Sequence, residues 1–334
     1  EQPNKTDFIK LNANENPYPP APGVIRAIEQ FRGGSLKKYP DANAKPLADA
    51  LAKRFGLKRE NVFLGNGSDD VLALCFRGFF NSDKPVIYPD ITYSFYPVWC
   101  DMLRIPFETI PVDDTFNINA ADYKRPNGGV VIANPNAPTS IGRGLDFMRE
   151  ILDANPDSVV ISDEAYVDFG GTSAVPLLKE YENLVVVQTF SKSRSMAGMR
   201  IGYALGNSDI IAALFAAKDS YNSYPLDSVA IAAGVASVED EEYFRATVAK
   251  VMTTRGRLTN VLREMGFDVA DSSTNFLFAE HPKYRAKDIQ EYLKTRDIYV
   301  RYFSKKRIDN RLRITIGTDE EIDALIAALK EYIK

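Results

Sequence analysis

Short apolar runs alternate with amphipathic stretches through the first two thirds of the chain. Runs rich in valine and isoleucine have the length of buried strands, and they lie at residues 62–64, 86–88, 130–132, 159–161 and 184–187. Between them, apolar residues recur at helical spacing over 71–80 and 93–102. This alternation predicts an α/β fold with a mostly parallel, doubly wound sheet, which binds its ligands at the carboxyl ends of the strands.

The pattern changes after residue 238. A charged amphipathic helix is expected first, followed by a mixture of strands and helices, at residues 240–265, 275–278, 288–295, 298–300, 312–316 and 319–333. We therefore predict a large α/β domain at 36–238 and a small α+β domain at 239–334. Residues 1–35 are expected to form an extended segment that packs on the small domain or on a second subunit, because prolines interrupt residues 11–22.

Composition narrows the class of protein. With 45% hydrophobic and 26% charged residues among 334, the chain fits a soluble globular enzyme of more than one domain. Its net charge of −4 argues against nucleic-acid binding, and no apolar run is long enough to span a membrane. The polar start predicts no signal peptide, and the isolated Cys75 and Cys100 are expected as buried thiols in a reducing cytoplasm. The single histidine, His281, argues against a zinc site or a histidine-based triad, and no metal is expected.

The segment from Thr189 to Tyr203 carries the most informative chemistry. Lys192 follows an apolar strand, which places an amine where an open α/β sheet binds its ligand. Arg200 lies eight residues further on, close to the small residues Ala197 and Gly198. An amine beside a guanidinium that binds phosphate is what a pyridoxal phosphate site needs. A surface lysine in a serine-rich loop is the alternative interpretation.

Other strand ends carry possible partners. Asp163 ends a buried strand, where its carboxylate can pair with a pyridine nitrogen; a helix cap or a surface salt bridge is the alternative. Tyr166 can donate a hydrogen bond to the 3′ oxygen of the cofactor, or simply pack. The loop 65–70 joins a strand to a helix, so its free N–H groups suit a phosphate, although Ser68 is also a plausible helix cap.

Three further side chains fit the same hypothesis. Tyr93 can lay its ring over a flat cofactor, with aromatic packing as the alternative. Arg313 and Arg301 lie on neighbouring predicted strands of the small domain, where a guanidinium can capture a carboxylate or a phosphate. A solvated basic face is the alternative for these arginines.

Taken together, these segments resemble the fold-type-I pyridoxal phosphate enzymes, and specifically the histidinol-phosphate aminotransferases. The matching segments are Leu11–Pro17, Lys38–Asp41, Gly65–Asp70, Asn134–Thr139, Asp163–Tyr166, Thr189–Tyr203 and Leu312–Thr318. They occur in the order of the family and span nearly the whole chain. The first of them, with Asn222–Asp227, points to the narrower family.

The resemblance implies a role for each candidate residue. Lys192 would form the Schiff base, Asp163 would bind the pyridine nitrogen and Tyr166 the 3′ oxygen. Tyr93 would stack on the cofactor ring, Arg313 would bind the substrate carboxylate, and Arg301 would bind the substrate phosphate together with the segment around Asn16 and Tyr18. The residues implied to bind the cofactor phosphate are Ser68, Asp69, Thr189, Ser191, Arg200 and Tyr39 of the second subunit. The active unit would therefore be a homodimer.

One position departs from the family pattern. Ala137 stands where these enzymes usually carry an asparagine whose amide bonds the 3′ oxygen. Losing such a bond costs about 1.5–3 kcal/mol. Either Tyr166 carries this role alone or Asn136 shifts to compensate, and Asn136 is therefore kept as a candidate contact.

The resemblance implies an aminotransferase that converts histidinol phosphate and 2-oxoglutarate to imidazole acetol phosphate and glutamate. A lyase of the threonine-phosphate decarboxylase type shares the same motifs, and an aromatic amino acid aminotransferase is a further alternative. A regulator that binds pyridoxal phosphate without catalysis is supported only by Ala137.

Overall fold

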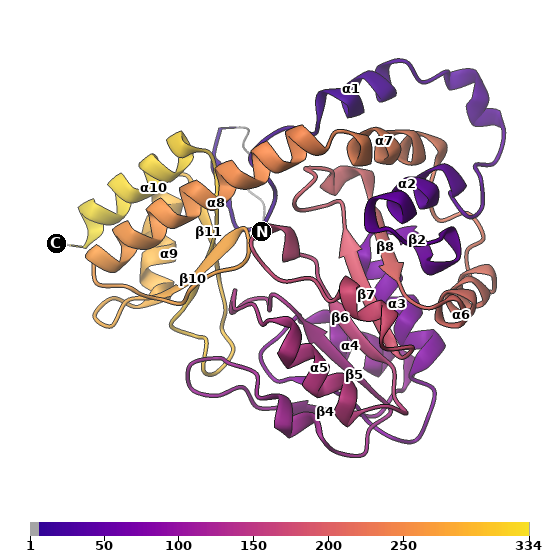
Figure 1. The fold of residues 1–334 in the computed structure, drawn as a ribbon. Coiled ribbons are helices and arrows are strands. Elements are labelled where there is room, and N and C mark those ends of the chain that lie inside the picture. The colour runs from indigo at the N-terminus through magenta and orange to yellow at the C-terminus, as the bar shows by residue number, and fades with distance from the viewer. Residues whose placement is uncertain (1–6, 334) are drawn as a thin grey trace.

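The computed structural model describes residues 7–333, and its ribbon forms two lobes (Figure 1). Each lobe is built on one sheet, and helix α8 (Glu241–Glu264) runs from the larger lobe along the smaller one. Apart from β1 (Ile9–Leu11), the strands of the two sheets fall on either side of residue 238. The domain boundary at that residue remains a prediction.

The larger sheet has seven strands in the order β2-β8-β7-β6-β5-β3-β4. The strands are β2 (Val62–Asn66), β3 (Val86–Pro89), β4 (Phe107–Ile110), β5 (Gly129–Ala133), β6 (Val160–Asp163), β7 (Leu184–Thr189) and β8 (Ile201–Leu205). Only β8 runs antiparallel to its neighbours, so the predicted mostly parallel α/β sheet is confirmed.

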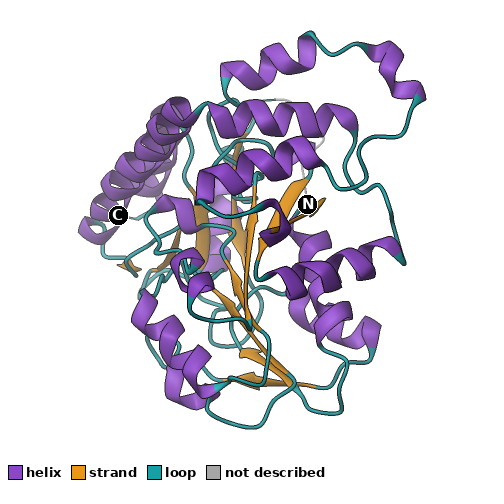
Figure 2. Ribbon diagram, turned by 45° about the vertical axis from the view of Figure 1, so that its right-hand side comes forward, coloured by secondary structure: helices purple, strands orange, loops and turns teal. Residues whose placement is uncertain are grey.

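Helices cover both faces of this sheet (Figure 2). They are α2 (Lys45–Phe55), α3 (Ser68–Phe79), α4 (Phe95–Leu103), α5 (Leu145–Ala154), α6 (Ser208–Asp219) and α7 (Ser228–Glu239). Because successive strand residues face opposite sides, Val130 and Ile132 join the core with α2, α5 and α7, whereas Val131 joins the core with α3, α4 and α6. Burial on both faces explains why these strands are continuous apolar runs.

The smaller sheet has the order β1-β11-β12-β10-β9. Its other strands are β9 (Asp268–Val269), β10 (Phe276–Glu280), β11 (Ile298–Tyr302) and β12 (Leu312–Thr315), and α8, α9 (Ala286–Thr295) and α10 (Asp319–Tyr332) pack with it. Strand β1 pairs in parallel with β11, and Leu11 is buried in this core. The beginning of the described chain is therefore fixed to the sheet of the C-terminal region.

The expectation of an extended segment over 1–35 is wrong in part. Residues 12–21 form no helix, but α1 spans Pro22–Glu29 and packs on α7. Proline is compatible with the first turn of a helix, where its missing N–H has no partner to lose, and Val24 anchors the buried face. Residues 1–6 of the predicted segment lie outside the described residues.

Short 3-10 turns complete the secondary structure at Gly33–Lys37, Arg59–Asn61, Ala120–Tyr123, Val167–Phe169, Val175–Lys179 and Ala197–Met199. Within residues 7–333, no helix is both long and apolar enough to cross a membrane.

Strand β8 passes very close to the turn that precedes α3. A Cβ atom on Gly202 would lie 2.3 Å from the backbone nitrogen of Ser68 and 2.3 Å from the carbonyl carbon of Gly67. Only glycine allows this approach, because neither backbone atom can rotate away.

We expect Gly202→Ala to lower the free energy of unfolding by about 1–3 kcal/mol, since the added methyl group must displace backbone. Gly198→Ala is the matched control, because a Cβ there meets no atom within 4 Å. Urea unfolding of the two variants measures the difference; equal stabilities would contradict the close packing.

Candidate active site

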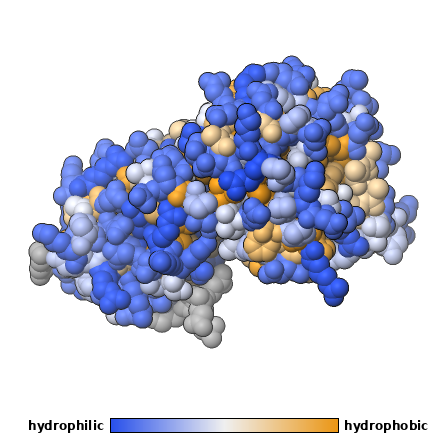
Figure 3. Space-filling view, turned by 90° about the horizontal axis from the view of Figure 1, so that it is seen from below, coloured by the Kyte–Doolittle hydropathy of each residue, from blue (hydrophilic) through white to orange (hydrophobic). Residues whose placement is uncertain are grey.

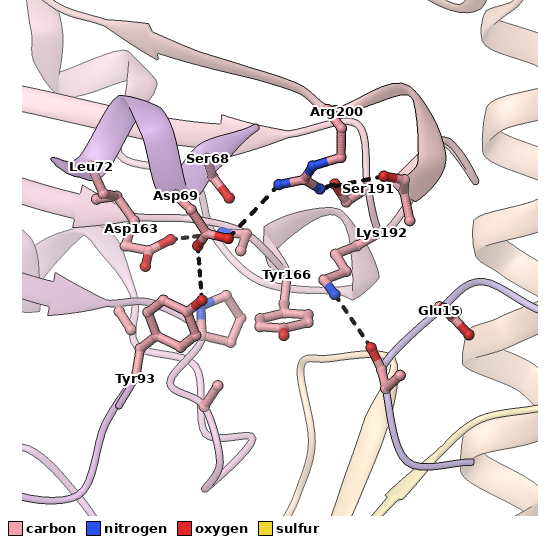
Figure 4. Close-up of a pocket in the computed structure, with 16 residues that line it drawn as sticks. Glu15, Ser68, Asp69, Leu72, Tyr93, Asp163, Tyr166, Ser191, Lys192 and Arg200 are labelled. Carbon is pink, nitrogen blue, oxygen red and sulfur yellow. Dashed lines mark hydrogen bonds and ion pairs between the residues drawn. The ribbon is translucent and has the colours of Figure 1, made fainter. Parts of the chain in front are cut away.

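A cavity of about 220 Å³ lies at the carboxyl ends of β5, β6 and β7, where the sheet was predicted to bind a ligand (Figure 4). Its wall includes most of the residues predicted to bind the cofactor: Ser68, Asp69, Tyr93, Asp163, Tyr166, Ser191, Lys192 and Arg200. Side chains from distant parts of the sequence therefore meet in one place.

Lys192 follows β7 and points into this cavity (Figure 4). Its Nζ lies 5.7 Å from the ring centroid of Tyr166 and 3.5 Å from the carbonyl oxygen of Ala13. No carboxylate forms an ion pair with this amine within residues 7–333. The amine is thus held near the cavity without a charged partner.

Asp163 ends β6 as a buried carboxylate. Its Oδ2 accepts a 2.7 Å hydrogen bond from the Tyr96 hydroxyl, and its Oδ1 accepts one from the backbone N–H of Ala165. Burial raises the pKa of Asp163 to about 6, because no arginine or lysine among the described residues pairs with it. A protonated pyridine nitrogen would offset this buried charge, so the site fits the ring of pyridoxal phosphate.

Polar groups converge at another part of the same cavity. Arg200 Nη1 lies 3.5 Å from Ser191 Oγ, and Arg200 Nη2 lies 3.8 Å from a carboxylate oxygen of Asp69. A Cβ on Gly67, which has φ 84°, would lie 2.4 Å from Arg200 Nη2, so glycine leaves room for the guanidinium. Together with the amino end of α3, this cradle suits a phosphate.

Thr189 lies behind this cradle. Its hydroxyl donates to Ser191 Oγ at 3.0 Å and accepts from the Ser191 backbone N–H, which fixes the serine. Tyr93 lines the cavity and donates from its hydroxyl to Asp69 Oδ1 at 2.8 Å. Burial, followed by the charge of Asp69, raises the pKa of the Tyr93 hydroxyl, so the hydroxyl remains a donor.

Asn136 is not placed as a cofactor contact. Its Nδ2 donates to the Ile91 carbonyl and to the Thr139 hydroxyl, while its Oδ1 accepts from the Thr92 hydroxyl. These bonds hold the loop together and leave Asn136 outside the cavity wall, whereas Ala137 lines it. The expectation that Asn136 compensates for Ala137 is therefore not supported, because its amide already has partners.

A second cavity of about 600 Å³ adjoins the first and shares Tyr93, Ala137 and Tyr166 with it. Arg313 on β12 and Arg301 on β11 both line it, as expected for substrate-binding residues. Arg313 Nη2 donates to the Asn12 carbonyl at 2.9 Å, while its Nε is buried and has no hydrogen-bond partner among the described residues. Burial lowers the pKa of Arg313.

Besides Asn136 and Thr189, three further predicted residues lie outside both cavities. Asn16 donates to the carbonyl oxygens of Lys192 and Ser193 and so supports the lysine loop. Tyr18 packs in the smaller core beneath Lys250. Tyr39 is 81% exposed and stacks on Tyr224 at 4.6 Å between ring centroids.

Two side chains that hold cavity residues by hydrogen bonds were missed at the sequence level. Tyr96 holds Asp163, and Asn14 donates from Nδ2 to the Tyr166 hydroxyl at 2.9 Å. The position of Tyr96, three residues after Tyr93, was the available signal for the first. Asn14 lies in the asparagine-rich stretch 12–16, but nothing in that stretch indicates a partner so far along the chain.

Comparison with known proteins agrees with this geometry. The family model for aminotransferase class I and II matches residues 6–329. The chain belongs to the class I and II aminotransferase family. A protein of Lactococcus lactis subsp. cremoris SK11, named histidinol-phosphate aminotransferase, is 51% identical over 334 residues, covering all of this chain and 94% of the relative. One of Acinetobacter baumannii AB307-0294 with the same name is 51% identical, covering 100% of this chain and 93% of the relative.

Solved structures show the same fold. Histidinol-phosphate aminotransferase from Sinorhizobium meliloti, in complex with pyridoxal-5′-phosphate, is 26% identical with a TM-score of 0.87, covering 97% of this chain and 90% of that one. The predicted fold-type-I fold, aminotransferase class and pyridoxal phosphate cofactor are confirmed. The roles of individual residues in this aminotransferase remain predictions.

The buried carboxylate predicts a pH dependence for the cofactor-free protein. A carboxyl whose pKa rises from 3.8 to about 6 on folding stabilises the protein only while it stays protonated. Stability therefore falls between these two pKa values and is level above the second. We expect Asp163→Asn to be more stable than the wild type above the second pKa, by on the order of 2–3 kcal/mol.

Urea unfolding of both cofactor-free proteins across this pH range measures the effect. The difference should vanish at acidic pH, where Asp163 is protonated in both states. A difference that is independent of pH would contradict the buried charge.

Proposed function

We propose that this aminotransferase transfers the amino group of L-histidinol phosphate to 2-oxoglutarate, giving imidazole acetol phosphate and glutamate. The observation that carries the proposal is the pair of adjoining cavities, with Lys192 in the first and Arg301 and Arg313 in the second. Relatives at 51% identity are named histidinol-phosphate aminotransferase, and this activity belongs to histidine biosynthesis.

The first cavity provides the groups that the cofactor requires. Bound pyridoxal phosphate supplies an aldehyde that condenses with amines and a ring that accepts electrons. Arg200, Ser191 and the amino end of α3 would bind its phosphate, and Asp163 would keep its ring nitrogen protonated. Tyr166 would donate a hydrogen bond to the 3′ oxygen.

Lys192 has two roles in this proposal. Its amine would hold the cofactor in the resting enzyme. Once the amino donor displaces it, the free amine stands beside the cavity and would take the proton from the Cα of the donor. The absence of a carboxylate partner among the described residues supports this, because an ion pair would hold the amine protonated.

The second cavity would recognise the substrates. Arg313, with a buried Nε that has no partner among the described residues, would bind the α-carboxylate of glutamate or of 2-oxoglutarate. Arg301, on the neighbouring strand, would bind the phosphate of histidinol phosphate, whereas Asn16 and Tyr18 line neither cavity. A guanidinium can bind either anion through two parallel hydrogen bonds.

A homodimer in the cytoplasm is part of the proposal. The face in Figure 3 shows patches of hydrophobic residues. The exposed large hydrophobic residues of the chain include Leu36, Tyr39, Phe95, Val98, Met102, Tyr221 and Tyr224. Tyr39 reaches neither cavity of its own chain, which supports a role in the second subunit's site. Cys75 and Cys100 are both free and buried, as expected in a reducing compartment.

The decisive experiment is a single half-reaction. The protein loaded with pyridoxal phosphate is mixed with L-histidinol phosphate and no keto acid. We expect its yellow absorbance to be replaced by that of pyridoxamine phosphate, and 2-oxoglutarate to restore it. Lys192→Ala is the matched variant, and it should lose both the yellow species and the reaction while keeping its fold by circular dichroism.

Other outcomes identify the alternatives. A protein that stays yellow with histidinol phosphate but releases carbon dioxide from phosphothreonine would be a lyase. A threonine-phosphate decarboxylase from Porphyromonas gingivalis has the same fold, with a TM-score of 0.82 at 21% identity. If only aromatic amino acids convert the yellow species to pyridoxamine phosphate, the protein is an aromatic aminotransferase. Failure to bind pyridoxal phosphate would refute the whole proposal.

A further inference from the structure

The hydroxyl of Tyr166 has to act as a hydrogen-bond donor without the help that an asparagine at position 137 would give. With Ala137 in the loop and Asn136 bonded within it, Tyr166 is the proposed donor to the 3′ oxygen of the cofactor. A tyrosine hydroxyl carries one hydrogen and also accepts hydrogen bonds, so it donates only if that hydrogen points the right way. Some group must therefore set its direction.

Asn14 is the group placed to do so. Its Nδ2 lies 2.9 Å from the Tyr166 oxygen and donates to it. An amide nitrogen cannot accept a hydrogen bond, so the hydrogen of Tyr166 is directed away from Asn14. Since Tyr166 lines both cavities, the free direction is toward the space that cofactor and substrate would occupy.

The orientation of Asn14 is itself fixed from the smaller sheet. The Thr315 hydroxyl accepts from the Asn14 backbone N–H at 3.0 Å and donates to Asn14 Oδ1 at 3.1 Å. The Asn275 side chain donates to the Asn14 carbonyl at 3.0 Å. With its oxygen engaged by Thr315, the amide turns its nitrogen toward Tyr166, and the residue is only 1% exposed.

The backbone of Asn14 also suits asparagine. Its φ of 54° lies in the left-handed region, which asparagine and aspartate tolerate better than most residues do. Glycine adopts this region without strain, so Asn14→Gly removes the side chain and still allows the same backbone conformation.

We propose that Asn14 is a positioning residue that holds the Tyr166 hydroxyl as a donor to the 3′ oxygen and so offsets the missing amide at Ala137. The inference rests on the proposed function only in assuming that pyridoxal phosphate binds at Lys192. The N-terminal segment would thus influence the protonation of the bound cofactor through a chain of hydrogen bonds. This chain runs from Thr315 and Asn275 through Asn14 to Tyr166.

The proposal predicts a spectroscopic shift in the resting enzyme, with no substrate present. The visible absorbance of the bound cofactor changes with pH when its link to Lys192 loses a proton and the negative charge remains on the 3′ oxygen. A hydrogen bond donated to that oxygen stabilises the charged form and lowers the midpoint of the titration. Weakening the donor must therefore raise the midpoint.

Two variants change the donor in different ways. In Asn14→Asp, the carboxylate accepts the Tyr166 hydrogen and turns it away from the cofactor, so the midpoint should rise by about one pH unit or more. In Asn14→Gly, the hydroxyl is only released, so a smaller rise is expected. The proposal thus predicts the order wild type, glycine variant, aspartate variant.

The other groups that face Tyr166 act equally in all of these proteins. They are Lys192 from the loop after β7, Arg313 from β12, Asp163 from β6, Asp69 from α3, Tyr93 and Tyr96 from α4 and the turn before it, and Glu15 from the N-terminal segment, which lines the same cavity. None of these groups is changed by a substitution at position 14. The carboxylate of Asn14→Asp adds a charge that itself raises the midpoint, so the shift of the uncharged Asn14→Gly variant is the one that reports on the Asn14 side chain.

A double variant separates positioning from a general structural effect. In a Tyr166→Phe background no hydroxyl remains to be oriented, so adding Asn14→Gly should leave the midpoint unchanged. Thermal unfolding of each loaded variant records any loss of fold. An unshifted midpoint in both single variants, or the same glycine-dependent shift with and without the Tyr166 hydroxyl, would overturn the proposal. A wild type that binds no pyridoxal phosphate would instead refute the proposed function, and the inference with it.

Discussion

A buried carboxylate without a cationic partner is the constraint on which the rest of the site depends. Asp163 lies at the end of a strand that is buried on both faces, and only the Tyr96 hydroxyl and one backbone N–H bond its oxygens among the described residues. Burying an unpaired charge is costly, which is why the pKa of this group is raised. A ligand that brings a positive charge to this point relieves the cost, and a protonated pyridine ring does so.

The remaining side chains are arranged around that point from several directions. The parallel strands deliver Asp163 and Lys192 to the same edge of the sheet, and β8 returns antiparallel to bring Arg200 beside the turn before α3. The segment 12–16 then crosses from the smaller sheet to the site. There it contacts Arg313 of the smaller sheet, and Tyr166 and the lysine loop of the larger lobe. The two sheets are thus connected at the place where the chemistry is proposed.

The sequence was sufficient for residues whose position follows from local pattern. Asp163 is the last residue of β6 and Lys192 lies three residues after the end of β7, and strand ends in an α/β sheet indicate a ligand site. It was not sufficient where a contact joins distant segments, as between Asn14 and Thr315, which lie 301 residues apart. The prediction for α1 was wrong because the prolines before it indicated an extended segment, whereas the helix begins at Pro22. The role of Asn136 could not be predicted because its hydrogen-bond partners come together only in the folded loop.

The protonation state of the cofactor ring nitrogen tests the central claim most directly. The enzyme is loaded with pyridoxal phosphate labelled with ¹⁵N in the ring and observed by NMR at alkaline pH, above the pKa of about 6 that burial gives Asp163. We predict the chemical shift and the one-bond N–H coupling of a protonated pyridine, and their loss in Asp163→Asn. A neutral ring nitrogen in the wild-type enzyme would contradict the account.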